Sequence, residues 1–149
     1  MARYFTFHSL EDLEDECGRL DLSIRFSSDL SPLFRPVAIG ALRAGNSLCI
    51  QPMEGCDGTL DGRPDELTFR RYRRFGAGGA KLIWGEATAV VEEGRANPRQ
   101  LLINDQNASD LERMLHECRH AHRAAFGSAE DLVIGLQLTH SGRYSYRRP

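Results

Sequence analysis

The sequence of 149 residues lacks the features that mark membrane and nucleic-acid-binding proteins. It has no apolar run long enough to span a bilayer. Its 19 basic and 21 acidic residues leave a net charge of -2, which gives no bulk attraction to nucleic acid or to an anionic membrane. The first eight residues are too short and too polar for a secretory signal. We therefore expect neither nucleic acid nor membrane among its partners.

Cysteine is also sparse, and its spacing is not that of a compact disulfide framework. The four cysteines are Cys17, Cys49, Cys56 and Cys118. Without a secretory signal, they are most simply interpreted as reduced thiols in a cytoplasm. The apolar content of 41% and the charged content of 27% are those of an ordinary globular protein of about one domain.

Three short apolar runs alternate with helical patterns. The runs cover about residues 47–51, 80–85 and 132–138, and residues 86–91 either continue the second run or turn out of it. Pro52 ends the first run because proline has no N–H for a sheet ladder. The third run is nearly all apolar, as in parallel strands covered on both faces. Repeated strand, loop and helix predict parallel β/α architecture, in which functional residues gather at the carboxyl ends of strands.

Two helices are predicted between these strands. The first has Pro64 in its first turn and ends within 76–79. Its four arginines are interpreted as a solvated face rather than a phosphate or nucleic-acid site: Arg70, Arg71, Arg73 and Arg74. The second begins at Asn107 or Ser109 and ends at Gly127. Helical spacing predicts its buried face from Leu111, Leu115, Cys118, His122 and Ala125.

Residues 1–45 are predicted to form an N-terminal extension and hairpin, and residues 46–149 the main α/β part. Ser9 and Asp12 match a capping box for a short acidic helix that runs to Cys17 and is ended by Gly18. Alternation over 23–27 predicts a strand, and 33–46 predicts a hairpin that leads into the first core strand.

Three strand ends and one helix carry a family likeness. The strand ends are 46–53, then Gly85-Glu-Ala-Thr-Ala-Val90 with Glu93-Gly-Arg95, then Leu136-Gln-Leu-Thr-His-Ser-Gly-Arg143. The helix end Tyr72-Arg-Arg-Phe-Gly-Ala-Gly-Gly-Ala80 also fits. In this order and spacing they resemble the old yellow enzyme family of FMN-dependent NADH:flavin oxidoreductases and ene-reductases, over about residues 32–146. The resemblance implies the N-terminal part of a TIM (β/α)8 barrel: about three β/α units preceded by a short helix and a β-hairpin.

The resemblance also implies flavin contacts at the strand ends. Gln51, Pro52 and Met53 correspond to backbone along the flavin ring, and Ala87 to a small residue that approaches it. Gln137 corresponds to an amide that bonds the pyrimidine edge, since a carboxamide offers a donor and an acceptor. The alternative for Gln137 is a buried amide satisfied by backbone. Pro52 and Ala87 are explained almost as well as ordinary strand-end residues.

One position departs from the family pattern. Glu54 stands where the family often has a Thr or Cys that hydrogen-bonds the flavin. A carboxylate there disfavours a negatively charged reduced flavin, so we expect a lowered potential or a protonated Glu54. The remaining alternative is that Glu54 turns away and Cys56 lies nearer the ring.

The resemblance implies an enzyme that uses FMN, with NAD(P)H as reductant and an activated alkene or similar small electrophile as substrate. His140 and Arg143 either line the mouth of the active site as catalytic residues or anchor the loop. Glu86 and Arg95 match family positions and are assigned structural roles only.

Much of the family's site lies beyond this sequence. A full barrel needs about 250 residues. The family's substrate-gripping pair, its proton-donating Tyr and its FMN phosphate site all follow the third strand. Three strands leave an unpaired edge and uncovered faces. We therefore expect a fragment that is unstable, aggregated or completed by a second copy or another chain, and inactive alone.

Two alternatives from other classes remain. His116-Glu-Cys-Arg-His120 is a literal HExxH motif, which in zinc hydrolases places two imidazoles and a general base on one helix face. Both histidines are expected to point to solvent, opposite the apolar face, and no third ligand follows in a recognisable context. We therefore predict no metal site. The other alternative is a non-catalytic subunit that pairs through its open sheet edge.

Overall fold

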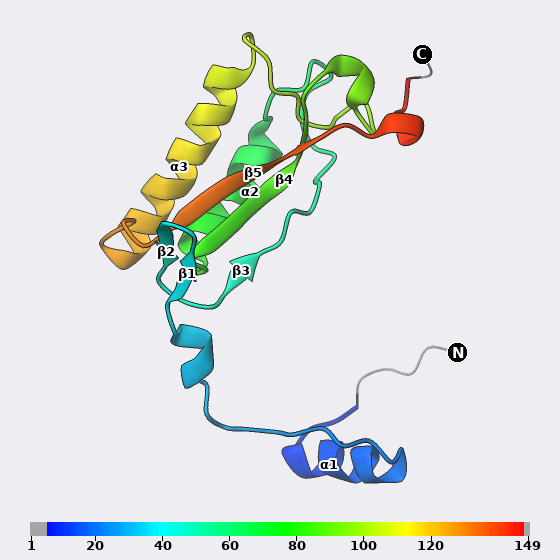
Figure 1. Ribbon diagram of the computed structural model, residues 1–149, viewed down its shortest axis with the longest axis vertical. Helices are drawn as coiled ribbons and strands as arrows, with labels where there is room; N and C mark the ends of the chain where they lie inside the picture. Colours follow the sequence, from blue (N-terminus) through cyan, green and yellow to red (C-terminus); the bar gives the residue numbers. More distant parts are fainter. Residues whose placement is uncertain (1–5, 148–149) are drawn as a thin grey trace. The chain divides into compact units, whose positions relative to one another are not determined.

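A computed structural model describes residues 6–147 (Figure 1). Residues 1–5 of the predicted N-terminal extension and residues 148–149 of the predicted α/β part lie outside the described residues. The chain divides into two compact units, one up to Ser31 and one from Pro32 onward. This division lies before the predicted boundary at residue 45, so the hairpin belongs with the α/β unit.

The first unit contains the helix α1 (Leu10–Arg19). The predicted capping box is confirmed: Ser9 Oγ accepts the Asp12 N–H, and Asp12 Oδ2 accepts the Ser9 N–H, both at 3.1 Å. The predicted end at Gly18 is wrong, because the Leu20 N–H still bonds the carbonyl groups of Glu16 and Gly18. The predicted strand at 23–27 is also wrong. Its residues pair with no described strand, and Ile24 is 55% exposed.

The second unit begins with the predicted hairpin, which the structure confirms. A 3-10 turn, η1 (Ser31–Phe34), precedes the antiparallel strands β1 (Val37–Ile39) and β2 (Leu42–Ala44). Gly40 takes the positive φ of +59° that the tight turn requires. Beyond β2, the Gly45 N–H donates to the Asp131 carbonyl at 3.0 Å, which ties the hairpin to the start of the last strand.

The three core strands are confirmed as one parallel sheet in the order β3-β4-β5. They are β3 (Cys49–Ile50), β4 (Leu82–Ala89) and β5 (Val133–Thr139). Of the two alternatives predicted for residues 86–91, the structure contains the first for residues 86–89, which continue the second strand. The register places Leu82 beside Cys49 on one side and Val133 on the other. The chain is therefore an α/β protein with a parallel sheet.

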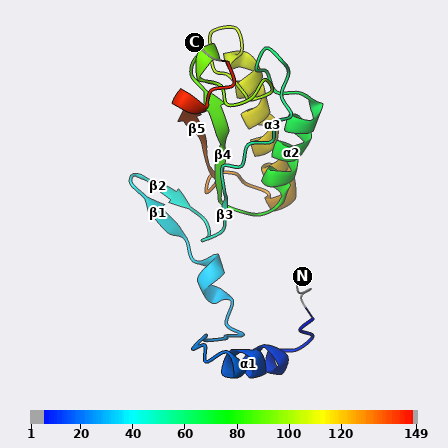
Figure 2. The same ribbon diagram turned by 90° about the vertical axis from the view of Figure 1, so that its right-hand side faces the viewer.

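The helices α2 (Glu66–Ala77) and α3 (Ala108–Phe126) cover one side of this sheet (Figure 2). Asp65 caps α2, so Pro64 lies before the helix rather than in its first turn. Gly76 lies inside α2, one residue before its end. Asn107 precedes α3, and Gly127 ends it with a φ of +80°.

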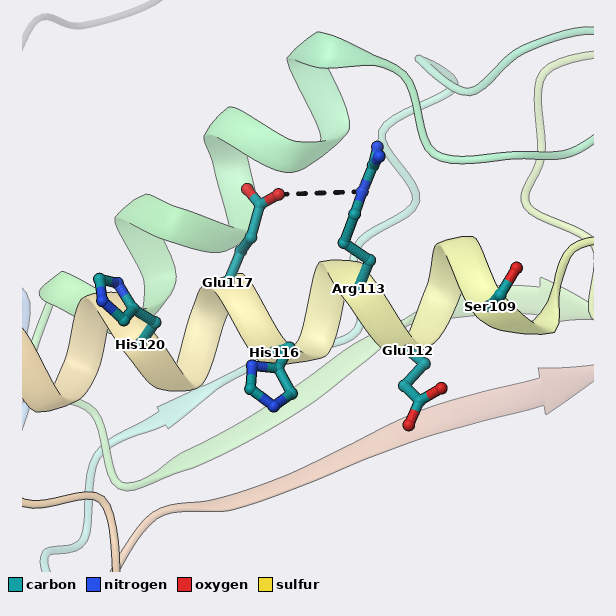
Figure 3. A pocket seen from close by; sticks show the side chains of 6 residues that line it. All are labelled: Ser109, Glu112, Arg113, His116, Glu117 and His120. Atoms are coloured by element: carbon teal, nitrogen blue, oxygen red, sulfur yellow. Dashed lines mark ion pairs between the residues drawn. The ribbon is translucent and has the colours of Figure 1, made fainter.

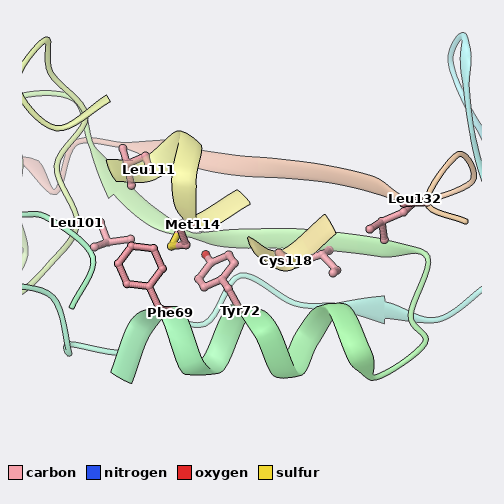
Figure 4. Close-up of a cluster of buried hydrophobic side chains, with 9 residues drawn as sticks. Phe69, Tyr72, Leu101, Leu111, Met114, Cys118 and Leu132 are labelled. Carbon is pink, nitrogen blue, oxygen red and sulfur yellow. The ribbon is translucent and has the colours of Figure 1, made fainter. Parts of the chain in front are cut away.

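The core lies between these helices and the sheet (Figure 4). Its buried α3 residues are Leu111, Met114, Cys118 and His122. Met114 was missed, and Ala125 is exposed, so its predicted burial is wrong. The next position at this spacing, Phe126, is 48% exposed, and its ring lies tilted against His122 with the ring centroids 4.7 Å apart.

The opposite face of the sheet has no such cover within the described residues. Trp84 is 44% exposed beside the buried Ile83, because successive strand side chains point to opposite faces. Gln137 of β5 is exposed on this same face, since its neighbour Leu136 packs against the core. The predicted cover on both faces of the third strand is therefore wrong for this chain. Within residues 6–147, no helix is long and apolar enough to cross a membrane.

Candidate functional site

The residues predicted to contact a cofactor gather at the carboxyl edge of the sheet. Gln51, Pro52 and Met53 directly follow β3. In β4, Ala87 lies level with Gln137 of β5 as its register partner. Because all three strands are parallel, these positions share one edge.

The side chain of Gln137 is available for a ligand. It is exposed, and its carboxamide forms no hydrogen bond within residues 6–147. This differs from the alternative of a buried, satisfied amide. The neighbouring Ala87 is partly buried, and its carbonyl accepts a hydrogen bond from Gln100 Nε2 at 3.2 Å. The pair therefore offers a small residue and an unused donor and acceptor side by side, which suits the edge of a planar heterocycle such as flavin.

The loop after β3 exposes Met53, at 76%, and partly buries Glu54. The Glu54 carboxylate accepts hydrogen bonds from the Asn97 side chain and, at 3.8 Å, from the Cys56 thiol. Burial raises the pKa of Glu54. Burial, with the nearby Glu54 carboxylate, also raises the pKa of Cys56. These contacts favour the alternative in which Glu54 turns toward the protein, and its role toward a flavin stays a prediction.

Beneath this loop lies an ion-pair network that sequence reasoning missed. Glu86 is 3% exposed and pairs with Arg71 at 2.8 Å, and the same guanidinium pairs with Asp57 at 2.7 Å. Burial raises the pKa of Glu86, although the Gly55 N–H and Arg71 oppose this shift. The solvated-face interpretation is thus wrong for Arg71, while Arg70 and Arg74 are exposed. A lone Glu inside an apolar strand was the signal that could have revealed the network.

The long connection between β4 and α3 is organised around the buried Arg95. Its guanidinium donates to the carbonyl groups of Leu60, Pro98 and Gln100 at 2.7–3.1 Å. A buried guanidinium bonded to three carbonyls fixes loop geometry, in keeping with the structural role assigned to this residue.

His140 and Arg143 follow β5 and are both exposed. The His140 ring packs on Gly94, and its Nδ1 accepts the Gly142 N–H at 3.0 Å. Arg143 donates to the Tyr144 hydroxyl at 2.6 Å. Both residues thus make loop contacts while remaining open to solvent, and their catalytic roles stay predictions.

The HExxH residues lie on the outer surface of α3 (Figure 3). They border a groove of about 410 Å³. Glu117 is paired with Arg73 at 2.8 Å and Arg113 at 3.9 Å, and His116 and His120 are exposed, as predicted. In the described part of the chain, no group of three or more His, Cys, Asp or Glu residues could hold a metal ion.

Comparison with known proteins finds partial relatives. No family model matches the chain. An NADPH dehydrogenase of Geobacillus sp. (strain WCH70) is 32% identical over 116 residues, which cover 76% of this chain and 31% of that protein. Morphinone reductase superposes with a TM-score of 0.60 and 27% identity, covering 80% of this chain and 29% of its own. The old yellow enzyme homologue from Zymomonas mobilis superposes with a TM-score of 0.59 and 28% identity. This match covers 72% of this chain and 28% of the homologue. The chain thus spans under a third of these relatives' length.

Proposed function

The chain matches the old yellow enzyme and NADPH dehydrogenase family over part of that family's length, and we propose that it forms one wall of an FMN site for NAD(P)H-dependent reduction. The observation that carries the proposal is the exposed carboxamide of Gln137, which forms no hydrogen bond to any described residue and lies beside Ala87 at the carboxyl edge of the sheet. In parallel β/α proteins this edge is where ligands bind.

The chemistry that FMN supplies when bound is hydride transfer from NAD(P)H to the electron-poor carbon of an activated alkene or a similar electrophile. This chain's residues hold and orient the ring. Gln137 donates and accepts hydrogen bonds at the ring edge, and Ala87 allows close backbone approach. Gln51, Pro52 and Met53 line the ring from the neighbouring strand end. Glu54, already bonded to Asn97, stays turned from it.

His140 and Arg143 complete the wall on the substrate side in this proposal. Both follow β5 at the same edge and are open to solvent, so each could donate a hydrogen bond to a small electrophile. The Gly142 N–H occupies Nδ1 of His140, which leaves Nε2 as the donor when the ring is neutral. In this proposal, the rest of the FMN site is supplied by a longer chain, a second copy or another polypeptide.

FMN titration tests the proposal. We expect the visible absorption of FMN to change on adding the chain. Gln137→Leu should weaken this binding by about 10-fold, because it removes two hydrogen bonds. Gln106→Leu is the matched control, since Gln106 is exposed and lies in the turn before α3 rather than on a core strand. Unaltered FMN absorption, or equal binding by Gln137→Leu, would contradict the proposal.

A non-catalytic pairing role is the second candidate, and the uncovered sheet face favours it. Trp84 is exposed on this face, and apolar sheet faces normally pack against other structure. A stable complex with another polypeptide that binds neither FMN nor zinc would support this candidate instead.

A further inference from the structure

The strand β4 contains an irregularity at Glu86. Gly85 pairs with Leu136 and Ala87 with Gln137, so Glu86 has no partner of its own in β5. Such a bulge commonly re-aims a side chain. The Glu86 N–H donates instead to the Tyr72 hydroxyl at 3.0 Å. The bulge therefore buries the Glu86 side chain beneath the loop that follows β3.

The buried carboxylate holds that loop at its centre. Glu86 Oε2 accepts the Gly55 N–H at 3.0 Å, and Oε1 lies 2.8 Å from Arg71 Nη1. Arg71 then reaches both sides of Gly55. It bonds Asp57 Oδ1 at 2.7 Å and the Met53 carbonyl at 3.5 Å. One ion pair thus contacts three points of residues 53–57.

Packing restricts the loop further. A Cβ atom on Gly55 would overlap the Arg71 guanidinium, so the loop backbone lies directly against it. Asp57 Oδ1 also accepts the hydroxyl of the buried Thr68 at 2.8 Å, which fixes the acceptor for Arg71. The path of the loop therefore depends on α2 as well as on β4.

We propose that Glu86 and Arg71 are positioning residues that clamp the loop 51–57 and so set the place of Pro52 and Met53 at the sheet edge. The clamp itself is a property of this chain's own contacts. Its role toward the flavin rests on the proposed function. Glu86 acts through the Gly55 N–H and through Arg71, and within residues 6–147 its side chain forms no hydrogen bond with Pro52 or Met53.

Amide hydrogen exchange tests the clamp without any cofactor. Glu86→Gln keeps the shape and an acceptor for the Gly55 N–H, but removes the charge that holds Arg71. We expect the amides of 53–57 to exchange about 10-fold faster, with those of α3 unchanged. Glu66→Gln is the matched control. It breaks the ion pair between Glu66 and Arg73, which is more exposed and belongs to α2, the helix that also contains Arg71. Unchanged exchange in Glu86→Gln would overturn the proposal.

A second variant covers the case in which Glu86→Gln does not fold. Asp57→Asn leaves the pair between Glu86 and Arg71 in place and weakens only the hold on the far end of the loop. We expect faster exchange in 53–57, by less than in Glu86→Gln and by more than in Glu66→Gln. Loss of protection throughout Glu86→Gln, together with unchanged exchange in Asp57→Asn, would overturn the clamp.

FMN titration of the same variants separates the clamp from the proposed function. If the clamp sets the flavin wall, Glu86→Gln binds FMN more weakly than Glu66→Gln does. Faster loop exchange without any FMN binding by the natural sequence would support the clamp and contradict the proposed function. Faster exchange with unaltered FMN affinity would overturn the link between the clamp and the flavin wall.

Discussion

The backbone of Gly76 in α2 lies so close to Cys118 in α3 that a Cβ atom on Gly76 would overlap the Cys118 carbonyl oxygen. The Gly76 carbonyl in turn accepts a hydrogen bond from Nδ1 of the buried His122 at 2.7 Å. The two helices therefore meet backbone to backbone, and the glycine sets how closely they pack.

Gly76→Ala should lower the free energy of unfolding by about 1–3 kcal/mol, because the added methyl group overpacks the helix contact. Urea denaturation measures the change. Gly18→Ala in α1 is the control, since a Cβ there meets no atom within 4 Å. Equal midpoints for Gly76→Ala and the natural sequence would show that the helices separate without cost.

Stability should fall at alkaline pH because of Cys118. Burial raises the pKa of this thiol to about 11. The pKa of a cysteine in an unfolded chain is about 8.5. Between these values the unfolded state loses its proton first, so the folded state becomes relatively less stable as the pH rises. The slope from this one group is at most about 1.4 kcal/mol per pH unit.

Denaturation between pH 8 and about 10.5 checks this slope. Cys118→Ala should reduce it, whatever the variant's stability at neutral pH. Cys17→Ala is the control, because Cys17 lies in α1, which buries no residue. An identical slope in Cys118→Ala and the natural sequence would mean that the thiol ionises equally in both states.

Arg95→Lys should destabilise the loops by at least about 2 kcal/mol, because a lysine cannot reproduce a planar guanidinium bonded to three carbonyls. The side chain of Arg95 is wholly buried, so a lysine in its place would bury a charge with fewer hydrogen-bond partners. Arg99→Lys is the control, since Arg99 is exposed and its side chain, among residues 6–147, bonds one group, the Gly58 carbonyl. Thermal unfolding that does not distinguish the two variants would contradict this role.

The uncovered sheet face should cause association. Replacing Trp84 by Ser should shift the chain toward a monomer in sedimentation experiments, because it removes exposed apolar surface from this face. Leu60→Ser is the control, since Leu60 is 68% exposed and belongs to a loop rather than to a strand. A natural sequence that sediments as a monomer and melts cooperatively would contradict the expected association and the need for a completing chain.

Local patterns in the sequence determined the elements of this protein. The Ser9 capping box, the stop at Gly127 and the apolar runs at 47–51, 80–85 and 132–138 depend on neighbours in the chain, and the structure contains each of them. The strand order also follows from sequence, because repeated β/α units build a parallel sheet. The strand predicted at 23–27 failed because alternation alone supplies no neighbouring strand to pair with.

Only the tertiary structure decided which charged residues are buried and what they hold. Arg71 belongs to a helix with three other arginines, and nothing local distinguishes it from Arg70 or Arg74. Its partial burial depends on a bulge 15 residues later in β4 that turns Glu86 under the loop. The exposure of Gln137, likewise, depends on what other structure packs at the sheet edge. These contacts join residues distant in sequence, and the energy of a buried charge is set by its partners in space.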